Sequence, residues 1–287
     1  MCLIKIATIP LCFSFLLGFH SIVQAEVKFS ETLEKRLNYF KKQCDKPYSV
    51  EGKLRPNKLL LLDASDPLDP EQIQFLRDNF VGDNITWKNE GDKFSIVLLD
   101  DKKTAQLDFI TLCAPLPENQ ITFTMAKNKV KQQIKAFKWS LTEGFEALAA
   151  STTEANHTPL IETIIEIHRN KRYGFTDGDK SLILASDLYQ NSEFLSFFYN
   201  VCREKKKYTV ATNRCKSFKN TLKMISSKNQ QFFKTQAKFD IKPTETIEIY
   251  HLKSNGEVNL TAKDWWVDYL KFAGYKKDNI KFISQLD

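Results

Sequence analysis

The fold of this chain is decided by the stretch Leu59-Leu60-Leu61-Leu62-Asp63-Ala64-Ser65-Asp66-Pro67. Four consecutive leucines between polar turn residues are typical of a strand that is buried on both faces. Such strands belong to parallel sheets that helices cover on both sides. The polar residues after the leucines stand where the chain leaves the sheet, and ligands of such folds bind beyond the carboxyl ends of the strands.

Apolar periodicity on both sides of this strand predicts an alternation of strands and helices. Further strands are expected at 94–99, 107–113, 181–186, 246–252 and 280–283, and helices at 31–44, 70–80, 127–150, 159–168 and 261–274. The first two of these strands are spaced for a hairpin, and the last is expected at an edge of the sheet. This alternation indicates a mainly parallel sheet with helices on both faces, so we predict a Rossmann-like α/β fold.

The first 25 residues have the pattern of a cleavable secretory signal. Lys5 is their only charged residue, an apolar run follows from Ile6 to Phe19, and Val23-Gln24-Ala25 precedes Glu26. A basic start, a short apolar core and small residues at the −3 and −1 positions are the features of a cleavage site. The run is shorter than the roughly 20 apolar residues that a membrane anchor needs. We therefore expect a signal peptide at 1–25, no transmembrane segment after its removal, and a periplasmic or secreted protein.

The chain is mildly basic, with 42 Lys and Arg against 35 Asp and Glu and a net charge of +7. Because the lysines are spread along several predicted helices, the charge by itself does not indicate nucleic acid binding. The lysine-rich stretch at about 193–242 has few strand signals, and we interpret it as a helical insertion in the fold. A second run of lysines lies beside the apolar stripe of the predicted helix at 127–150, where a solvated face is favoured over a polyanion site.

Four cysteines follow the predicted cleavage site: Cys44, Cys113, Cys202 and Cys215. In an exported chain an even number suggests two disulfides, for which three connectivities exist. We favour Cys202–Cys215, which would close a basic loop, together with Cys44–Cys113. The sequence has no C-x-x-C pattern, so a redox or zinc motif of that kind is not expected.

Polar side chains follow the predicted strands in a way that suggests a metal site. Asp63 and Ser65 come after the first strand, Thr158 precedes the helix at 159–168, and Asp187 follows the strand at 181–186. In a parallel sheet these positions converge at one rim. Two carboxylates and two hydroxyls are hard oxygen ligands that suit Mg²⁺, with water completing its octahedron.

These residues resemble the metal-ion-dependent adhesion site of von Willebrand factor A-like domains. That motif reads Asp-x-Ser-x-Ser after the first strand, with a threonine before a later helix and an aspartate after the next strand. The chain resembles more closely a divergent group of exported bacterial proteins of this class. Its motifs read Asp-x-Ser/Thr-Asp-Pro, Ser/Thr-Pro-Leu and Ser-Asp-x-x-Gln-Asn-Ser, which match 63–67, 158–160 and 186–192, and the Trp265-Trp266 segment that ends at Gly274 is similar too.

The resemblance implies a von Willebrand factor A-like domain at 57–287, with the insertion at about 193–242, after a helical lead-in at 26–56. It places the metal ligands at Asp63, Ser65, Thr158 and Asp187. One departure is that Pro67 occupies the position of the second motif serine. Asp66 could replace that ligand, or it could cap the following helix.

The function that the resemblance implies is binding of a protein partner outside the cytoplasm, through a degenerate site of this type and without catalysis or nucleic acid. Two alternatives remain open. The chain could be a Mg²⁺-dependent phosphohydrolase with Asp63 as nucleophile, although such enzymes want a second aspartate at position 65. It could also dock without metal through the basic insertion.

Outside the rim, we expect His168 to be a partly buried packing residue, and Trp265 and Trp266 to divide between core and surface.

Overall fold

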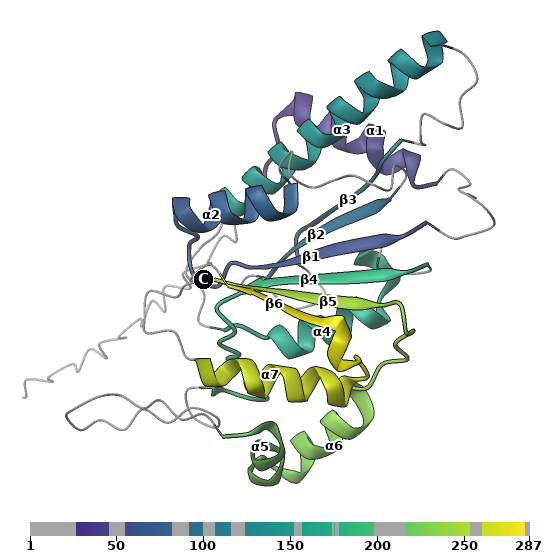
Figure 1. Ribbon diagram of the computed structural model, residues 1–287. Helices are drawn as coiled ribbons and strands as arrows, with labels where there is room; N and C mark the ends of the chain where they lie inside the picture. Colours follow the sequence, from purple (N-terminus) through teal and green to yellow (C-terminus); the bar gives the residue numbers. More distant parts are fainter. Residues whose placement is uncertain are drawn as a thin grey trace, which may run out of the picture.

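A computed structural model of the chain describes residues 27–45, 55–81, 92–99, 107–115, 124–151, 157–173, 175, 178–197, 216–252 and 260–284 (Figure 1). The predicted signal peptide, Cys202 and Cys215 lie outside these residues. Within them, no helix combines the length and the apolar character that a membrane span requires.

A six-stranded sheet forms the middle layer, with the order β3-β2-β1-β4-β5-β6. Its strands are β1 (Asn57–Asp63), β2 (Lys93–Leu99), β3 (Phe109–Cys113), β4 (Lys180–Ser186), β5 (Thr246–His251) and β6 (Ile280–Ser284). All neighbours are parallel except β2 and β3, which pair antiparallel. The α/β class, the mainly parallel sheet, the antiparallel pair and the edge position of the last strand are thereby confirmed.

The leucines of β1 are buried on both faces, as their unbroken run predicts. β1 pairs with β2 on one side and with β4 on the other. Leu59 and Leu61 belong to one hydrophobic cluster, and Leu60 and Leu62 to the other. Side chains of a strand point alternately to its two faces, so one short segment contributes to both cores.

Helices cover both faces of the sheet (Figure 1). One face carries α1 (Glu31–Gln43), α2 (Pro70–Leu76), a π-helical turn (Arg77–Val81) and α3 (Thr124–Ala150). The other carries α4 (Leu160–Arg169), α5 (Phe218–Met224), α6 (Ser227–Gln236) and α7 (Leu260–Ala273). The expected helix starts hold within a few residues, and Asp69 caps α2 with a capping box. The aspartate that caps this helix is therefore Asp69 and not Asp66.

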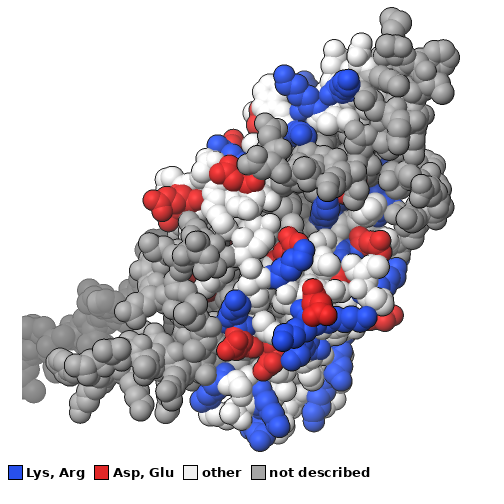
Figure 2. All heavy atoms as spheres, in the orientation of Figure 1, with Lys and Arg blue, Asp and Glu red and all other residues white. Residues whose placement is uncertain are grey.

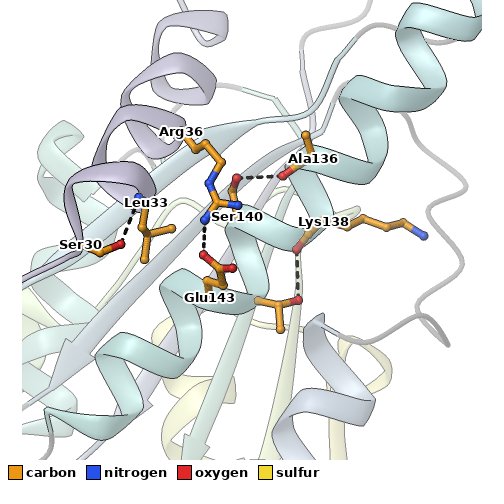
Figure 3. Close-up of polar contacts among 8 residues, drawn as sticks. Ser30, Leu33, Arg36, Ala136, Lys138, Ser140 and Glu143 are labelled. Carbon is orange, nitrogen blue, oxygen red and sulfur yellow. Dashed lines mark hydrogen bonds and ion pairs between the residues drawn. The ribbon is translucent and has the colours of Figure 1, made fainter.

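The N-terminal helix α1 belongs to the same core as the sheet. Its residues Leu33, Leu37 and Phe40 are buried in the cluster that also contains β1, β2 and β3. The Ser30 side chain accepts a hydrogen bond from the Leu33 amide, and Arg36 forms an ion pair with Glu143 of α3 (Figure 3). The segment expected as a lead-in therefore packs as an integral helix of the fold.

The structure also joins α1 to the sheet covalently. Cys44, directly after α1, forms a disulfide with Cys113 at the end of β3, and the Cα atoms are 5.1 Å apart. The pair lies at the amino edge of the sheet, because Cys113 is opposite Lys93 at the start of β2. This bridge is the second of the two pairs favoured from the sequence, and the first lies outside the described residues.

The expectation that Trp265 and Trp266 divide between core and surface is wrong, because both are buried, with 1% and 0% of their surface exposed. Helix α7 has the sheet on one side and α5 and α6 on the other, so it is covered from two directions (Figure 1). The Trp265 indole donates a hydrogen bond to Thr221 of α5 at 3.0 Å. Helix α7 ends where predicted, at Gly274, whose φ of 124° favours glycine.

Candidate functional site at the carboxyl ends of β1 and β4

Asp63 is the last residue of β1, and it is buried, with 5% of its surface exposed. Its Oδ1 accepts a hydrogen bond from the Ser65 amide at 3.1 Å, and its Oδ2 accepts one from the Ser186 hydroxyl at 2.6 Å. Burial raises the pKa of Asp63, while the hydrogen bonds from Ser186 and Ser65 lower it. The carboxylate is therefore fixed in orientation by one donor from the loop after β1 and one from the last residue of β4.

Asp187 follows β4, the strand that neighbours β1. Its Oδ1 accepts a hydrogen bond from the Tyr189 amide at 2.9 Å, which closes a local turn. Burial and then the nearby charge of Asp63 raise the pKa of Asp187 to about 7. The two predicted aspartates are therefore close enough to repel each other, as the adjacency of their strands requires.

Asp66 contributes a third negative charge, although its side chain is exposed. Its charge raises the pKa values of both Asp63 and Asp187. It does not cap α2, so it remains available for the supporting role that the sequence suggested. Ser65, two residues before Pro67, is buried beside Asp63.

Thr158 is brought to the same rim by the loop that follows β4. It forms a two-residue bridge with Asn191, in which the Thr158 amide donates at 2.7 Å and the Asn191 amide donates at 2.9 Å. These are backbone bonds, and they fix the start of α4 to the loop that carries Asp187. Thr158 itself is buried, with 7% of its surface exposed.

Gln190 is a residue of the third motif whose role the sequence did not reveal. It is fully buried, and its Oε1 accepts a hydrogen bond from the amide of Ile161 in the first turn of α4, at 2.9 Å. Its amide group donates to Glu162 at 3.0 Å and to Ser192 at 2.9 Å. The side chain satisfies an amide that the helix leaves unpaired and holds the Asp187 loop against α4.

Leu188 joins this loop to the C-terminal helix. Its φ of 68° is unusual for a residue with a side chain, and that side chain is fully buried. Its amide donates to the Ser186 hydroxyl at 2.8 Å, and its carbonyl accepts a hydrogen bond from the Trp266 indole at 3.0 Å. The Trp265-Trp266 segment was noted in the sequence, but its link to the rim depends on tertiary structure.

The donor set at the rim fits a hard divalent cation in kind. Asp63, Asp187, Ser65 and Thr158 offer carboxylate and hydroxyl oxygens, which suit Mg²⁺. In the part of the chain that the structure describes, no three His, Cys, Asp or Glu side chains are grouped closely enough to hold a metal ion. Asp63, Asp66 and Asp187 therefore do not form such a group, although the charge of Asp66 acts on the other two carboxyl groups. Any cation here would depend on the two hydroxyls and on water.

His168 lies away from this rim and is a packing residue, as expected. Its ring stacks on Phe239 with centroids 4.1 Å apart. Its Nδ1 donates to the Ile164 carbonyl at 2.8 Å, so its Nε2 accepts from the Tyr275 hydroxyl at 2.9 Å. Burial lowers the pKa of His168 to about 4, so the ring is neutral at physiological pH.

No protein-family model matches this chain, and no curated protein matches it in sequence.

Proposed function

We propose that the chain is an exported von Willebrand factor A-type domain that binds a protein partner through a degenerate metal-ion-dependent adhesion site. The ligands of this site are Asp63, Ser65, Thr158 and Asp187, with Asp66 in support, and the favoured cation is Mg²⁺. The partner supplies an acidic or polar group to the cation. The resemblance in the motifs supports the family, and a shared fold supports function only by analogy.

One observation carries this proposal: the buried Asp63 and the partly buried Asp187 lie at the ends of adjacent central strands, and the charge of Asp63 makes ionisation of Asp187 less favourable. The charge of Asp63 contributes to raising the pKa of Asp187 to about 7. Without a cation the pair costs free energy, because like charges in a poorly solvated site repel. A divalent cation between them would convert that cost into binding free energy.

The residue at position 65 favours binding over catalysis. A phosphohydrolase with an aspartate nucleophile wants an acid/base partner two residues later. Position 65 is serine, whose hydroxyl hydrogen-bonds to Asp63. The phosphohydrolase alternative therefore lacks the groups that would support it, and turnover of a generic phosphoester is the assay that tests it.

Thermal unfolding with and without divalent cations tests the metal site directly. A cation that binds only the native state stabilises it by RT ln(1 + [L]/Kd), which is about 2.7 kcal/mol at a hundredfold excess over Kd. We expect millimolar Mg²⁺ or Mn²⁺ to raise the Tm of the parent protein and to leave that of Asp187→Ala unchanged. A parent protein that does not respond to either cation would rule out the metal.

The basic insertion gives a second candidate function, docking to an acidic surface without metal. Helices α5 and α6 present exposed lysines at positions 219, 223, 228 and 234, and the sequence from Lys216 to Lys238 contains no Asp or Glu. Figure 2 shows lysine and arginine side chains over the lower end of the molecule, where α5 and α6 lie in Figure 1. Binding that is lost at high salt, persists in EDTA and is weakened by Lys219→Glu with Lys223→Glu would favour this candidate over the rim.

A further inference from the structure

The surface formed by α1 and α3 carries two exposed aromatic rings. Tyr39 of α1 is 44% exposed and Trp139 of α3 is 60% exposed. They are two of the three large exposed apolar side chains in the described part of the chain, and the third, Met224, lies on α5 across the sheet. Exposed aromatic side chains that gather on one face mark interaction sites more often than single ones do.

Both rings are held by polar neighbours between the two helices. The Arg36 guanidinium lies 4.3 Å from the centroid of the Trp139 ring and forms an ion pair with Glu143 (Figure 3). The Gln133 amide donates a hydrogen bond to the Tyr39 hydroxyl at 2.9 Å. Side chains that are already ordered lose less conformational entropy when a partner binds, so these rings are prepared for contact.

Exposed lysines flank both rings at helical spacing. Lys42 stands three residues after Tyr39, and Lys135 stands four residues before Trp139. Lys35, four residues before Tyr39, already forms an ion pair with Glu31. Residues three or four apart lie side by side on a helix. From Thr124 to Thr142, α3 contains five lysines and no Asp or Glu. This run of positive charge would attract an anionic partner.

This surface is separate from the candidate metal site. The disulfide between Cys44 and Cys113 places the end of α1 at the amino edge of the sheet. Asp63 and Asp187 lie at the carboxyl edge, where β1 and β4 end. A ligand at the rim and a partner on α1 and α3 would therefore occupy different parts of the molecule.

We propose that the α1–α3 surface binds an acidic segment of a partner protein, which packs apolar side chains on Trp139 and Tyr39 and places carboxylates beside the lysines. Trp, Tyr and Arg are the residues most enriched at the energetic centres of protein interfaces. A bilayer suits this surface less well, because Arg36 covers one face of the Trp139 ring and keeps it from entering lipid. Arg36 also leaves only one face of the Trp139 ring on which a nucleotide base could stack, so this surface suits single-stranded nucleic acid less well.

The test uses a fluorescein-labelled peptide of alternating glutamate and leucine, and the full mature chain in EDTA at low salt. We expect the peptide to bind with an affinity that falls as salt rises, since the lysines supply part of the attraction. Trp139→Ala or Tyr39→Ala is expected to weaken binding at least about tenfold, as truncation of a central aromatic contact does. Lys135→Glu with Lys42→Glu should have a similar effect without removing either ring.

Two comparisons make the result specific. Lys276→Glu with Lys277→Glu, at two exposed lysines before the edge strand β6, makes the same change in net charge elsewhere and should leave peptide affinity unchanged. Vesicles of phosphatidylglycerol and phosphatidylcholine, and a single-stranded oligonucleotide, should bind no differently to Trp139→Ala than to the parent. Absence of peptide binding, equal loss in the Lys276 and Lys277 variant, or a Trp139-dependent loss for vesicles or oligonucleotide would each overturn the proposal. Because EDTA removes divalent cations, failure here is distinct from failure of the rim site.

Discussion

The indole nitrogen of Trp266 donates a hydrogen bond of 3.0 Å to the carbonyl oxygen of Leu188, the residue that follows Asp187. A side chain near the C-terminus thereby fixes a loop that begins 78 positions earlier in the sequence. Leu188 needs such support, because its positive φ costs of the order of 1 kcal/mol or more for a residue with a side chain. The position of Asp187 thus depends on α7 as well as on β4.

Trp266→Phe removes this donor, and Trp265→Phe is a matched control, because its indole bonds to Thr221 of α5 instead. Both changes leave a small cavity and an unpaired acceptor, so each is expected to lower stability by about 1–3 kcal/mol in urea unfolding. Only Trp266→Phe is expected to reduce the rise in Tm that Mg²⁺ produces. Equal Mg²⁺ responses in the two variants would show that Leu188 does not position the site.

The raised pKa of Asp187 predicts a dependence of stability on pH. The folded protein keeps this proton up to a pH of about 7, whereas the unfolded chain releases it near 3.8, so the free energy of unfolding falls as pH rises through that window. The slope is at most about 1.4 kcal/mol per pH unit. We expect Asp187→Asn to gain stability relative to the parent as pH rises from 4 to 8. A difference between the two proteins that is constant with pH would contradict the raised pKa.

His168 changes the free energy of unfolding with pH in the opposite direction to Asp187. The Asp187→Asn variant is therefore compared with the parent at each pH, so that the effect of His168 cancels. Its pKa is lowered to about 4, and its stabilising contribution is therefore complete above about 6.5 and is lost between 6.5 and 4. Tyr275→Phe removes the donor to its Nε2 and should cost about 1–3 kcal/mol. Tyr269→Phe is the control, because the buried Tyr269 hydroxyl has no hydrogen-bond partner in the described structure. Removal of the Tyr269 hydroxyl is expected to leave stability unchanged or to raise it. If Tyr269→Phe lost as much stability as Tyr275→Phe, the hydrogen bond between Tyr275 and His168 would not be the cause of the loss.

Gln190→Ala is expected to destabilise the fold by about 2–3 kcal/mol. It removes the acceptor of the buried Ile161 amide and one of the donors to the partly buried Glu162. Gln231→Ala on the exposed face of α6 is the matched control and should change stability by less than about 0.5 kcal/mol. Denaturant midpoints at constant m-value measure both. A near-neutral Gln190→Ala would mean that the rim loop does not rely on this side chain.

The disulfide between Cys44 and Cys113 closes a segment with a sequence separation of 69. The chain-entropy account gives such a bridge about 4 kcal/mol of stabilisation, and measured values are often smaller. We expect Cys44→Ser with Cys113→Ser to lower the Tm relative to that of the oxidised parent, and to remove the part of the parent's response to reducing agent that this bridge produces. Peptide mapping without reduction should recover the linked pair, and free thiols at both positions in protein purified without reducing agent would contradict it.

The sequence by itself determined the α/β class, the central strand and the start of the helix at position 70. These features depend on local physics, since an unbroken leucine run favours a strand with two covered faces, and apolar residues at helical spacing favour a helix. The sequence also named the rim aspartates, because parallel strands end at one edge. Only the tertiary structure decided which side chains hold the rim loop, through the hydrogen bonds of Ser186, Gln190 and Trp266. It also decided that Trp265 and Trp266 are both buried, and that Tyr39 and Trp139 are exposed. Hydrogen bonding and burial between distant segments depend on how layers pack, and no periodicity within one segment records that.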